Sequence, residues 1–263
     1  MTARLGSGLR IAACGGVAAL WLVAASAHAA DEEIQVYMDE IGTPHVPSLD
    51  VHLNYVPKGR TLPDYPGEEA SGGRFRVTPE WAYALNPNLE LGAYLPLAEI
   101  RRDGQAEIGG AKVRVKWVAP KAQGQDWFWG LNFEIGRVRH DVDRNPWNAE
   151  LKGIAGVRKG PWTLAANINV DWVVQGPDHG APDLQLATKL GYALDKETSI
   201  GVESYDALGT TRRFSSFDRG DHQIFVVMDR GFGRWDLNLG IGRGYGAPED
   251  RWIIKAVVGV PIA

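Results

Sequence analysis

The sequence WTLAANINVDW, residues 162–172, carries the clearest structural pattern of the chain. Apolar side chains recur at every second position, with Trp162 and Trp172 at the two ends, and Asn167, Asn169 and Asp171 occupy alternate positions. A period of two is that of an extended strand, whose successive side chains point to opposite sides. An apolar face of about ten residues with an aromatic ring at each end is typical of a strand that crosses a lipid bilayer.

The same alternation recurs before and after this stretch. Residues 150–157 repeat it, and the turn 158–161 joins the two segments into a hairpin. Twelve strands are predicted in all, at 49–55, 75–85, 89–95, 113–117, 131–135, 150–157, 162–172, 184–192, 200–203, 222–229, 235–241 and 252–260. The orientation of 222–229 stays open because both of its faces are apolar. We therefore predict an all-β chain that forms a single antiparallel up-and-down transmembrane β-barrel.

The connections between the predicted strands differ in length in an alternating way. Short links at 86–88, 158–161, 195–198 and 230–234 alternate with long polar ones at 57–71, 99–105, 139–146, 174–183, 207–221 and 243–251, and 119–125 is intermediate. Outer-membrane barrels have short periplasmic turns and longer external loops. An even strand number also returns the chain to the side from which it started. A soluble β-sandwich alternates too and is the commoner class, but an exported twelve-strand sandwich with two bands of tryptophan and no cysteine should be rare.

Large aromatic residues gather near the ends of the predicted strands. Near the short turns lie Trp81, Tyr83, Trp117, Trp127, Trp162, Tyr192 and Trp235, and near the long loops lie Tyr55, Trp147, Trp172 and Trp252. Tryptophan and tyrosine are enriched at both interfaces of a membrane. These residues are expected to form two aromatic girdles.

The N-terminus has the features of an export signal. Arg4 and Arg10 precede an apolar run, and Ala27-His28-Ala29 is a signal-peptidase pattern, so residues 1–29 are predicted to be a signal peptide that is removed. Residues 30–47 are expected to be a periplasmic lead-in or a partial strand, and 48–263 the outer-membrane barrel. The single cysteine, Cys14, lies in the removed segment, so no disulfide is expected.

The polar faces of the strands are predicted to line the lumen. Their charged members are Asp50, His52, Arg74, Arg76, Glu80, Lys112, Arg114, Lys116, Glu134, Glu150, Lys152, Asp171, Lys189, Asp236 and Lys255. Two interpretations stay open. Opposite charges could neutralise one another in a plugged barrel, or they could line a narrow passage whose selectivity is biased by the basic row Lys112, Arg114 and Lys116.

Neither catalysis nor a cofactor is expected. Outer-membrane hydrolases of the lipid A deacylase and phospholipase families carry a His-x-Ser pair, and no histidine here has serine two positions later. The pairs Asp141/Asp143 and Asp50/His52 match the spelling of omptin proteases, but they fall at opposite ends of the predicted barrel. The histidines are scattered, which argues against a metal site, and the net charge of −4 argues against nucleic acid.

Several short segments resemble a known group of proteins. EIQVY (33–37), LNYVPKGR (53–60), TPEWAY (78–83) and ELGAYLP (90–96) resemble uncharacterised outer-membrane barrel proteins of Gram-negative bacteria, and they are similar to the meta-pathway phenol-degradation transporter family. This resemblance implies a barrel and the uptake of small or aromatic molecules, and it carries no catalytic residue.

We therefore expect a monomeric channel or transporter in the outer membrane, for small molecules that include aromatic or hydrophobic ones. Its expected partners are outer-membrane lipid and a small-molecule solute. The alternatives are a plugged barrel with a structural or surface-interaction role and, second, an outer-membrane hydrolase.

Overall fold

The computed structural model describes residues 33–246 and 250–262, so the predicted signal peptide lies outside the described residues. Its elements are β1 (Pro47–Lys58), β2 (Phe75–Asn86), β3 (Leu89–Ile100), β4 (Ala106–Val118), β5 (Trp127–Val138), β6 (Trp147–Lys159), β7 (Trp162–Gln175), β8 (Asp183–Ala193), β9 (Thr198–Thr210), β10 (Arg213–Phe214), the short 3₁₀ helix η1 (Phe217–Arg219), β11 (Asp221–Phe232), β12 (Trp235–Gly246) and β13 (Trp252–Val260). No helix among the described residues is long and apolar enough to cross a membrane.

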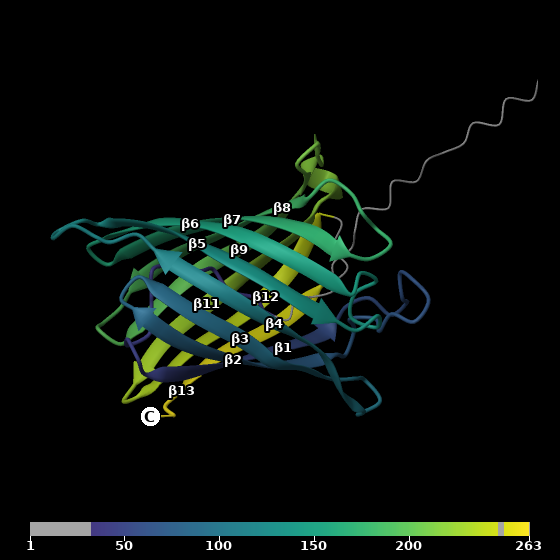
Figure 1. Cartoon of the computed structure of the whole chain (residues 1–263), viewed down its shortest axis with the longest axis horizontal. Coiled ribbons are helices and arrows are strands. Elements are labelled where there is room, and N and C mark those ends of the chain that lie inside the picture. Colours follow the sequence, from purple (N-terminus) through teal and green to yellow (C-terminus); the bar gives the residue numbers. More distant parts are fainter. Residues whose placement is uncertain (1–32, 247–249, 263) are drawn as a thin grey trace, which may run out of the picture.

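Twelve of the strands close into one antiparallel ring (Figure 1). Strand β1 pairs with both β2 and β13, and β8 pairs with β9, so the ring has no open edge. The remaining strand, β10, pairs with β9 alone and lies outside the ring. The predicted twelve-stranded barrel is confirmed. Closure gives every strand of the ring a neighbour on both sides, which a sheet in hydrocarbon requires.

The connections have the predicted asymmetry. The links 87–88, 119–126, 160–161, 194–197 and 233–234 lie at one end, where the chain also enters β1 and leaves β13. The links 59–74, 101–105, 139–146, 176–182 and 211–220 lie at the other end, where β12 also ends and β13 begins. By the usual arrangement of outer-membrane barrels, the first end is the periplasmic one and the second the external one.

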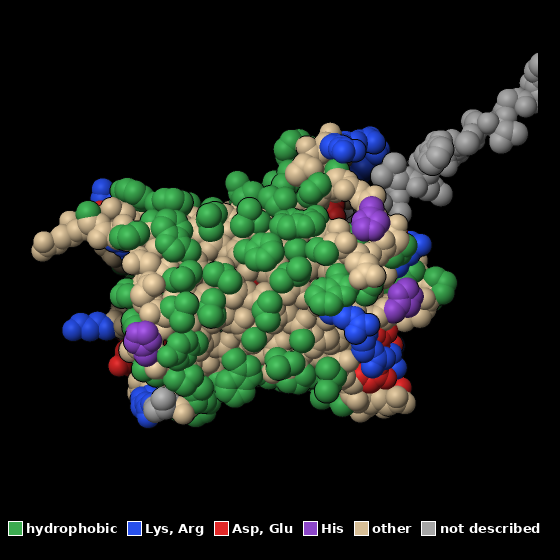
Figure 2. Space-filling model, in the orientation of Figure 1, with side chains coloured by type: hydrophobic (Ala, Val, Ile, Leu, Met, Phe, Trp, Pro, Cys, Tyr) green, Lys and Arg blue, Asp and Glu red, His purple; other side chains and the backbone are tan. Residues whose placement is uncertain are grey.

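The wall of the barrel is apolar outside and polar inside. On β7, Leu164 and Ile168 are 52% and 55% exposed, whereas Asn167 between them is fully buried. Hydrophobic side chains form a broad band over the outer wall, and charged ones gather toward its two ends (Figure 2). This distribution fits a surface that faces acyl chains.

The aromatic residues predicted to form girdles lie on the outward-facing positions of their strands. Nine of them are exposed, and Trp117 and Trp172 are partly covered. The cover comes from neighbouring rings: Trp117 packs against Trp129 at 5.1 Å between centroids, and Trp172 lies 6.2 Å from Phe133. Their role as membrane girdles stays a prediction.

Residues 33–46 differ from the expected periplasmic lead-in or partial strand. They form no strand, and Ile34, Val36 and Tyr37 are buried. They pack in one cluster with side chains that point inward from the wall, namely Val56, Phe128, Ile154, Ala165, Ala187, Tyr205, Phe225, Val227 and Ile253. The segment therefore lies inside the barrel. The physical reason is that a ring of twelve strands encloses more space than its own side chains fill, and apolar inward-facing residues need a partner.

The same cluster settles the orientation of β11. Phe225 and Val227 face inward, with exposures of 0% and 2%, and Ile224 and Val226 face outward, with 45% and 69%. Both faces of β11 are apolar because one meets lipid and the other meets the inner segment.

Candidate functional site: the lumen and the segment inside it

The inner segment is held by main-chain contacts with side chains of the wall. The side chain of Asn167 pairs with both main-chain groups of Tyr37: its Oδ1 accepts from the nitrogen at 2.6 Å, and its Nδ2 donates to the oxygen at 2.8 Å. Lys255 donates to the carbonyl of Ile34 at 2.9 Å. These contacts satisfy buried backbone groups that no strand partner reaches.

Toward the periplasmic end, the wall holds the next part of the segment. Lys116 donates to the carbonyl of Glu40 at 2.7 Å. The amide of Gly42 donates to Glu90 at 2.7 Å, and the amide of His45 donates to the carbonyl of Ala84 at 2.8 Å. The last of these is a backbone contact with the rim of β2, so the segment is anchored where it enters β1.

Ion pairs tie the same part of the segment to the periplasmic turns. Asp39 pairs with both Arg158 and Lys121, and Glu40 pairs with Arg158 at 2.5 Å. Arg158 and Lys121 are partly exposed, so salt screens these pairs and each contributes modestly.

Tyr37 is the central contact of the segment. The Nζ of Lys152 lies 4.2 Å from the centre of its ring, and the Nζ of Lys116 lies 5.0 Å away, both within cation–π range. Its hydroxyl meets the hydroxyl of Tyr94 at 2.5 Å, and Glu134 lies 3.5 Å from it. A ring surrounded by cations and hydrogen-bonded at its tip fits a residue that fills the middle of a polar lumen.

Around Tyr37, the charged residues of one wall form a network. Arg114 donates to Glu80 at 2.5 Å and to Glu90 at 2.8 Å, and His52 lies 2.8 Å from Glu80. Lys152 pairs with Glu150 at 3.0 Å. Opposite charges thus lie side by side within the lumen.

A second network lies on the wall formed by β8, β9, β11 and β13. Lys255 pairs with Glu203, which also accepts from Lys189 at 3.2 Å and from the hydroxyl of Tyr205 at 2.8 Å. Lys189 reaches Asp229 at 2.8 Å. Glu203 is 1% exposed, so it depends on these donors for the interactions that water would otherwise supply.

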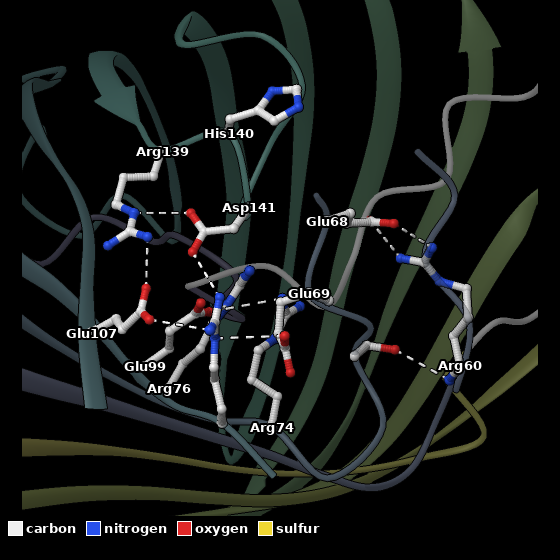
Figure 3. A network of polar contacts seen from close by, with 12 residues as sticks. Arg60, Glu68, Glu69, Arg74, Arg76, Glu99, Glu107, Arg139, His140 and Asp141 are labelled. Carbon is white, nitrogen blue, oxygen red and sulfur yellow. Dashed lines mark hydrogen bonds and ion pairs between the residues drawn. The ribbon is translucent and has the colours of Figure 1, made fainter. Parts of the chain in front are cut away.

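At the external end, charged residues of the loops and of the adjoining ends of β2, β3 and β4 form a network of ion pairs (Figure 3). Arg74 and Arg76 approach Glu99 at 3.7 and 3.8 Å. Arg101 pairs with Glu107 at 3.1 Å and with Asp141 at 3.2 Å. Asp141, in the link 139–146, is therefore buried within an ion-pair network.

The structure places the predicted lumen residues on inward-facing positions, with different degrees of burial. Buried ones are His52, Arg74, Arg76, Glu80, Arg114, Lys116, Glu134, Lys152, Lys189 and Lys255, and partly buried ones are Asp50, Lys112, Glu150 and Asp171. Asp236 is exposed, close to the periplasmic end of β12. Sequence reasoning missed the role of Tyr37, Tyr94 and Phe128. The alternation could have found Tyr94 and Phe128, which occupy inward positions of β3 and β5, whereas Tyr37 lies in a segment that forms no strand.

One group in the described part of the chain has the spacing of possible metal ligands. Glu33, His52 and Glu80 offer atoms that lie within 4.8 Å of one another. Glu80 is already engaged by Arg114 and His52, which compete with a metal ion. We interpret the group as part of the ion-pair network.

The arrangement around His222 does not activate a serine. Ser204 donates to Asp206 at 2.7 Å, and His222 lies 2.8 Å from the same carboxylate. The other ring nitrogen of His222 lies 2.8 Å from the carbonyl of Phe217. The imidazole is thus occupied on both sides, and the serine is bound to the carboxylate, whereas a nucleophile and base must meet directly.

Comparison with known proteins gives likeness in structure alone. No family model matches the chain, and no curated protein matches it. Among solved structures it is similar to the COG4313 outer membrane channel from Pseudomonas putida F1, with a TM-score of 0.61, 13% identity, and coverage of 86% of this chain and 99% of that one. It is also similar to the KdgM porin, with a TM-score of 0.54, 13% identity, and coverage of 82% of this chain and 99% of that one. A third similar structure is the NanC porin, with a TM-score of 0.53, 8% identity, and coverage of 80% of this chain and 97% of that one. At these identities the likeness shows a porin-like outer-membrane barrel fold.

Proposed function

We propose that this protein is an outer-membrane channel for small solutes, closed in the present structure by its own residues 33–46. The observation that carries the proposal is how the segment is held. It contributes no strand to the ring, and its contacts inside the lumen run mainly to side chains of the wall. The segment can therefore leave the lumen while the ladders of the twelve strands stay intact. The porin-like fold supports this function.

The charge of the segment indicates which solutes an open lumen favours. Residues 33–46 include the acids Glu33, Asp39 and Glu40 and contain no lysine or arginine. When the segment leaves, Arg158 and Lys121 lose their acidic partners, and Lys116 and Lys255 lose main-chain acceptors. The open lumen is more positive than the closed one, so we propose small anions as the favoured class.

One of the solved porins supports a lumen that admits polar solutes. The KdgM porin is known in complex with disordered oligogalacturonate, and this chain matches that structure with a TM-score of 0.55 and 10% identity. The uptake of aromatic or hydrophobic molecules, which the sequence resemblance implied, has less support from a lumen with so many buried charges.

The test is conductance in planar bilayers of the refolded protein. Three forms are compared: the mature chain, a variant without residues 33–42, and a variant in which 33–42 are replaced by a Gly/Ser segment of equal length. We expect rare openings in the first and frequent discrete steps with anion preference in the other two. Silence of all three forms, with normal barrel circular dichroism, overturns the channel.

The basic row of β4 gives a second measurement. Alanine at Lys112, Arg114 and Lys116 in the variant without residues 33–42 should move the reversal potential toward cations, since Glu80 and Glu90 then lose their arginine. An unchanged reversal potential would remove these residues from the selectivity argument.

The second candidate is a plugged barrel that acts through its external surface. The buried segment and the paired charges favour it as well. In that case the variant without residues 33–42 conducts while the mature chain stays silent under all voltages and salts tested.

A further inference from the structure

The connection between β9 and β11 folds back over the outer wall of the barrel. In the register of β9, β11 and β12, His222 lies opposite Asp206 and Tyr245. Ile224 and Val226, two and four positions along from His222, face the lipid, so His222 is also on the outer face. Yet His222 is only 2% exposed, because Phe217 covers it, with 4.2 Å between ring centroids.

This loop is held in a defined position. The carbonyl of Phe217 can only accept a hydrogen bond, so the Nε2 of His222 donates to it at 2.8 Å. Asp206, 2.8 Å from the other ring nitrogen, also accepts from Ser204 at 2.7 Å and from Tyr245 at 3.1 Å. The rings of Phe217, His222 and Tyr245 stack one on another. The loop is thus ordered before any ligand arrives, which reduces the entropy lost on binding.

The exposed side of the loop is both aromatic and cationic. Phe214 and Phe217 are 70% and 67% exposed. Arg212, Arg213 and Arg219 are exposed as well, and Arg212 and Arg213 form no ion pair with a described residue. In Figure 1 the light-green loop with η1 stands out from the wall, and in Figure 2 blue and green side chains meet at that place. Asp218 is the one acid among residues 211–220.

The level of the loop in the membrane follows from the strand geometry. Residues on one face of a strand are about 7 Å apart, two rises of about 3.3 Å. The covered residue His222 therefore lies about 7 Å further along the strand than Ile224, in the direction of the external end, and Ile224 faces lipid. Arg243, opposite Ile224, is also on the outer face, 5.9 Å from the ring of Trp252. A cation beside a tryptophan on the outer face is typical of the level at which acyl chains give way to headgroups.

We propose that residues 211–219 form a docking surface for a phosphorylated glycolipid of the outer leaflet, with the arginines on its phosphates and the phenylalanines at its acyl boundary. Guanidinium groups bind phosphate in a bidentate manner, and aromatic rings favour the membrane interface. The inference rests on the outer-membrane placement of the proposed function, and it is independent of whether the lumen conducts.

The test uses the full mature chain in detergent, titrated with diphosphorylated lipid A and with its dephosphorylated form. We expect the diphosphorylated lipid to bind at least ten-fold more tightly, and Arg212→Ser/Arg213→Ser to abolish that difference. Phe214→Ser should weaken both lipids, since it removes apolar contact and no charge. The matched control is Arg102→Ser/Arg144→Ser, which removes two exposed arginines from other external loops and should leave the preference intact.

Three results would overturn the proposal: equal affinity for the two lipids, an unchanged preference in Arg212→Ser/Arg213→Ser, or loss of the preference in the control variant as well. Conductance of the Arg212→Ser/Arg213→Ser variant should equal that of the parent. A silent channel that still distinguishes the two lipids would refute the proposed function and leave this inference standing.

Discussion

The side-chain amide of Asn167 binds the main chain of Tyr37 through both of its polar atoms, at 2.6 and 2.8 Å. It acts there as a neighbouring strand would, with one donor and one acceptor, although it comes from the wall of the barrel and the peptide group lies inside. Both residues are buried. This single amide fixes the middle of the inner segment relative to β7.

Asn167→Ala should therefore loosen the segment without harming the barrel. The variant leaves the buried amide and carbonyl of Tyr37 without partners, a loss of about 1–3 kcal/mol in the closed state. At 1.4 kcal/mol per factor of ten, the open probability in planar bilayers should increase by a factor of between about 5 and about 150. Asn169→Ala is the control, because Asn169 bonds to Gln185 of the wall. An equal rise in both variants would contradict the role of Asn167.

Lys255→Met should destabilise the whole protein. Lys255 neutralises Glu203 and donates to Ile34, so its removal leaves Glu203 with Lys189 as its remaining cation. Breaking one partner of a buried pair costs about 3–5 kcal/mol. Urea unfolding in lipid vesicles, followed by tryptophan fluorescence, should show this loss. Adding Glu203→Gln should recover part of it, and a double variant as unstable as the single one would argue against charge as the cause.

Gly156 and Gly153 on β6 should respond differently to alanine. A Cβ at Gly156 would run into the ring of Phe128 and lie 2.7 Å from the carbonyl oxygen of Leu164, whereas at Gly153 the nearest atom is 3.8 Å away. Overpacking costs about 1–3 kcal/mol. Gly156→Ala should lower the urea midpoint of unfolding, and Gly153→Ala should leave it nearly unchanged. Equal midpoints would show that Phe128 can move aside.

The external loop 59–74 should become more mobile in acid. Arg60 donates to both oxygens of Glu68, at 2.6 and 2.7 Å, and the amide of Asp64 donates at 2.5 Å. Burial opposes the ionised form, but these contacts prevail and hold the pKa of Glu68 below its usual range. A lowered folded-state pKa gives stability that is present above about pH 4.3, the ordinary value, and is lost as the pH falls through the lowered pKa.

Hydrogen exchange measures that change in the loop. Protection of the Asp64 amide should decrease as the pH is lowered through this window, after correction for the intrinsic exchange rate. In Glu68→Gln the protection should be low at every pH. A pH dependence that survives in Glu68→Gln would assign the titration to another group.

The sequence by itself determined the wall of this protein. In stretches such as 162–172 the sequence alternates with a period of two, with Leu164 and Ile168 on one face and Asn167 on the other. The alternation follows from the surroundings of each face. In a barrel with lipid outside and a polar interior, the apolar face must point outward and the polar face inward. Whether a stretch forms a strand, and which of its faces is polar, depends on residues that are close in the sequence. The number of strands, the end at which each loop lies and the inward position of the charged residues could therefore be predicted.

Only the tertiary structure decided what fills the lumen. Residues 33–46 lack a regular period, and their partners, Asn167 and Lys255 among them, lie far away in the sequence. A cavity is a property of the closed ring, so no single strand shows that Phe225 and Val227 need an apolar neighbour inside. The position of the loop at Phe217 on the outer wall has the same origin, because it depends on the registers of β9, β11 and β12 once the ring has closed.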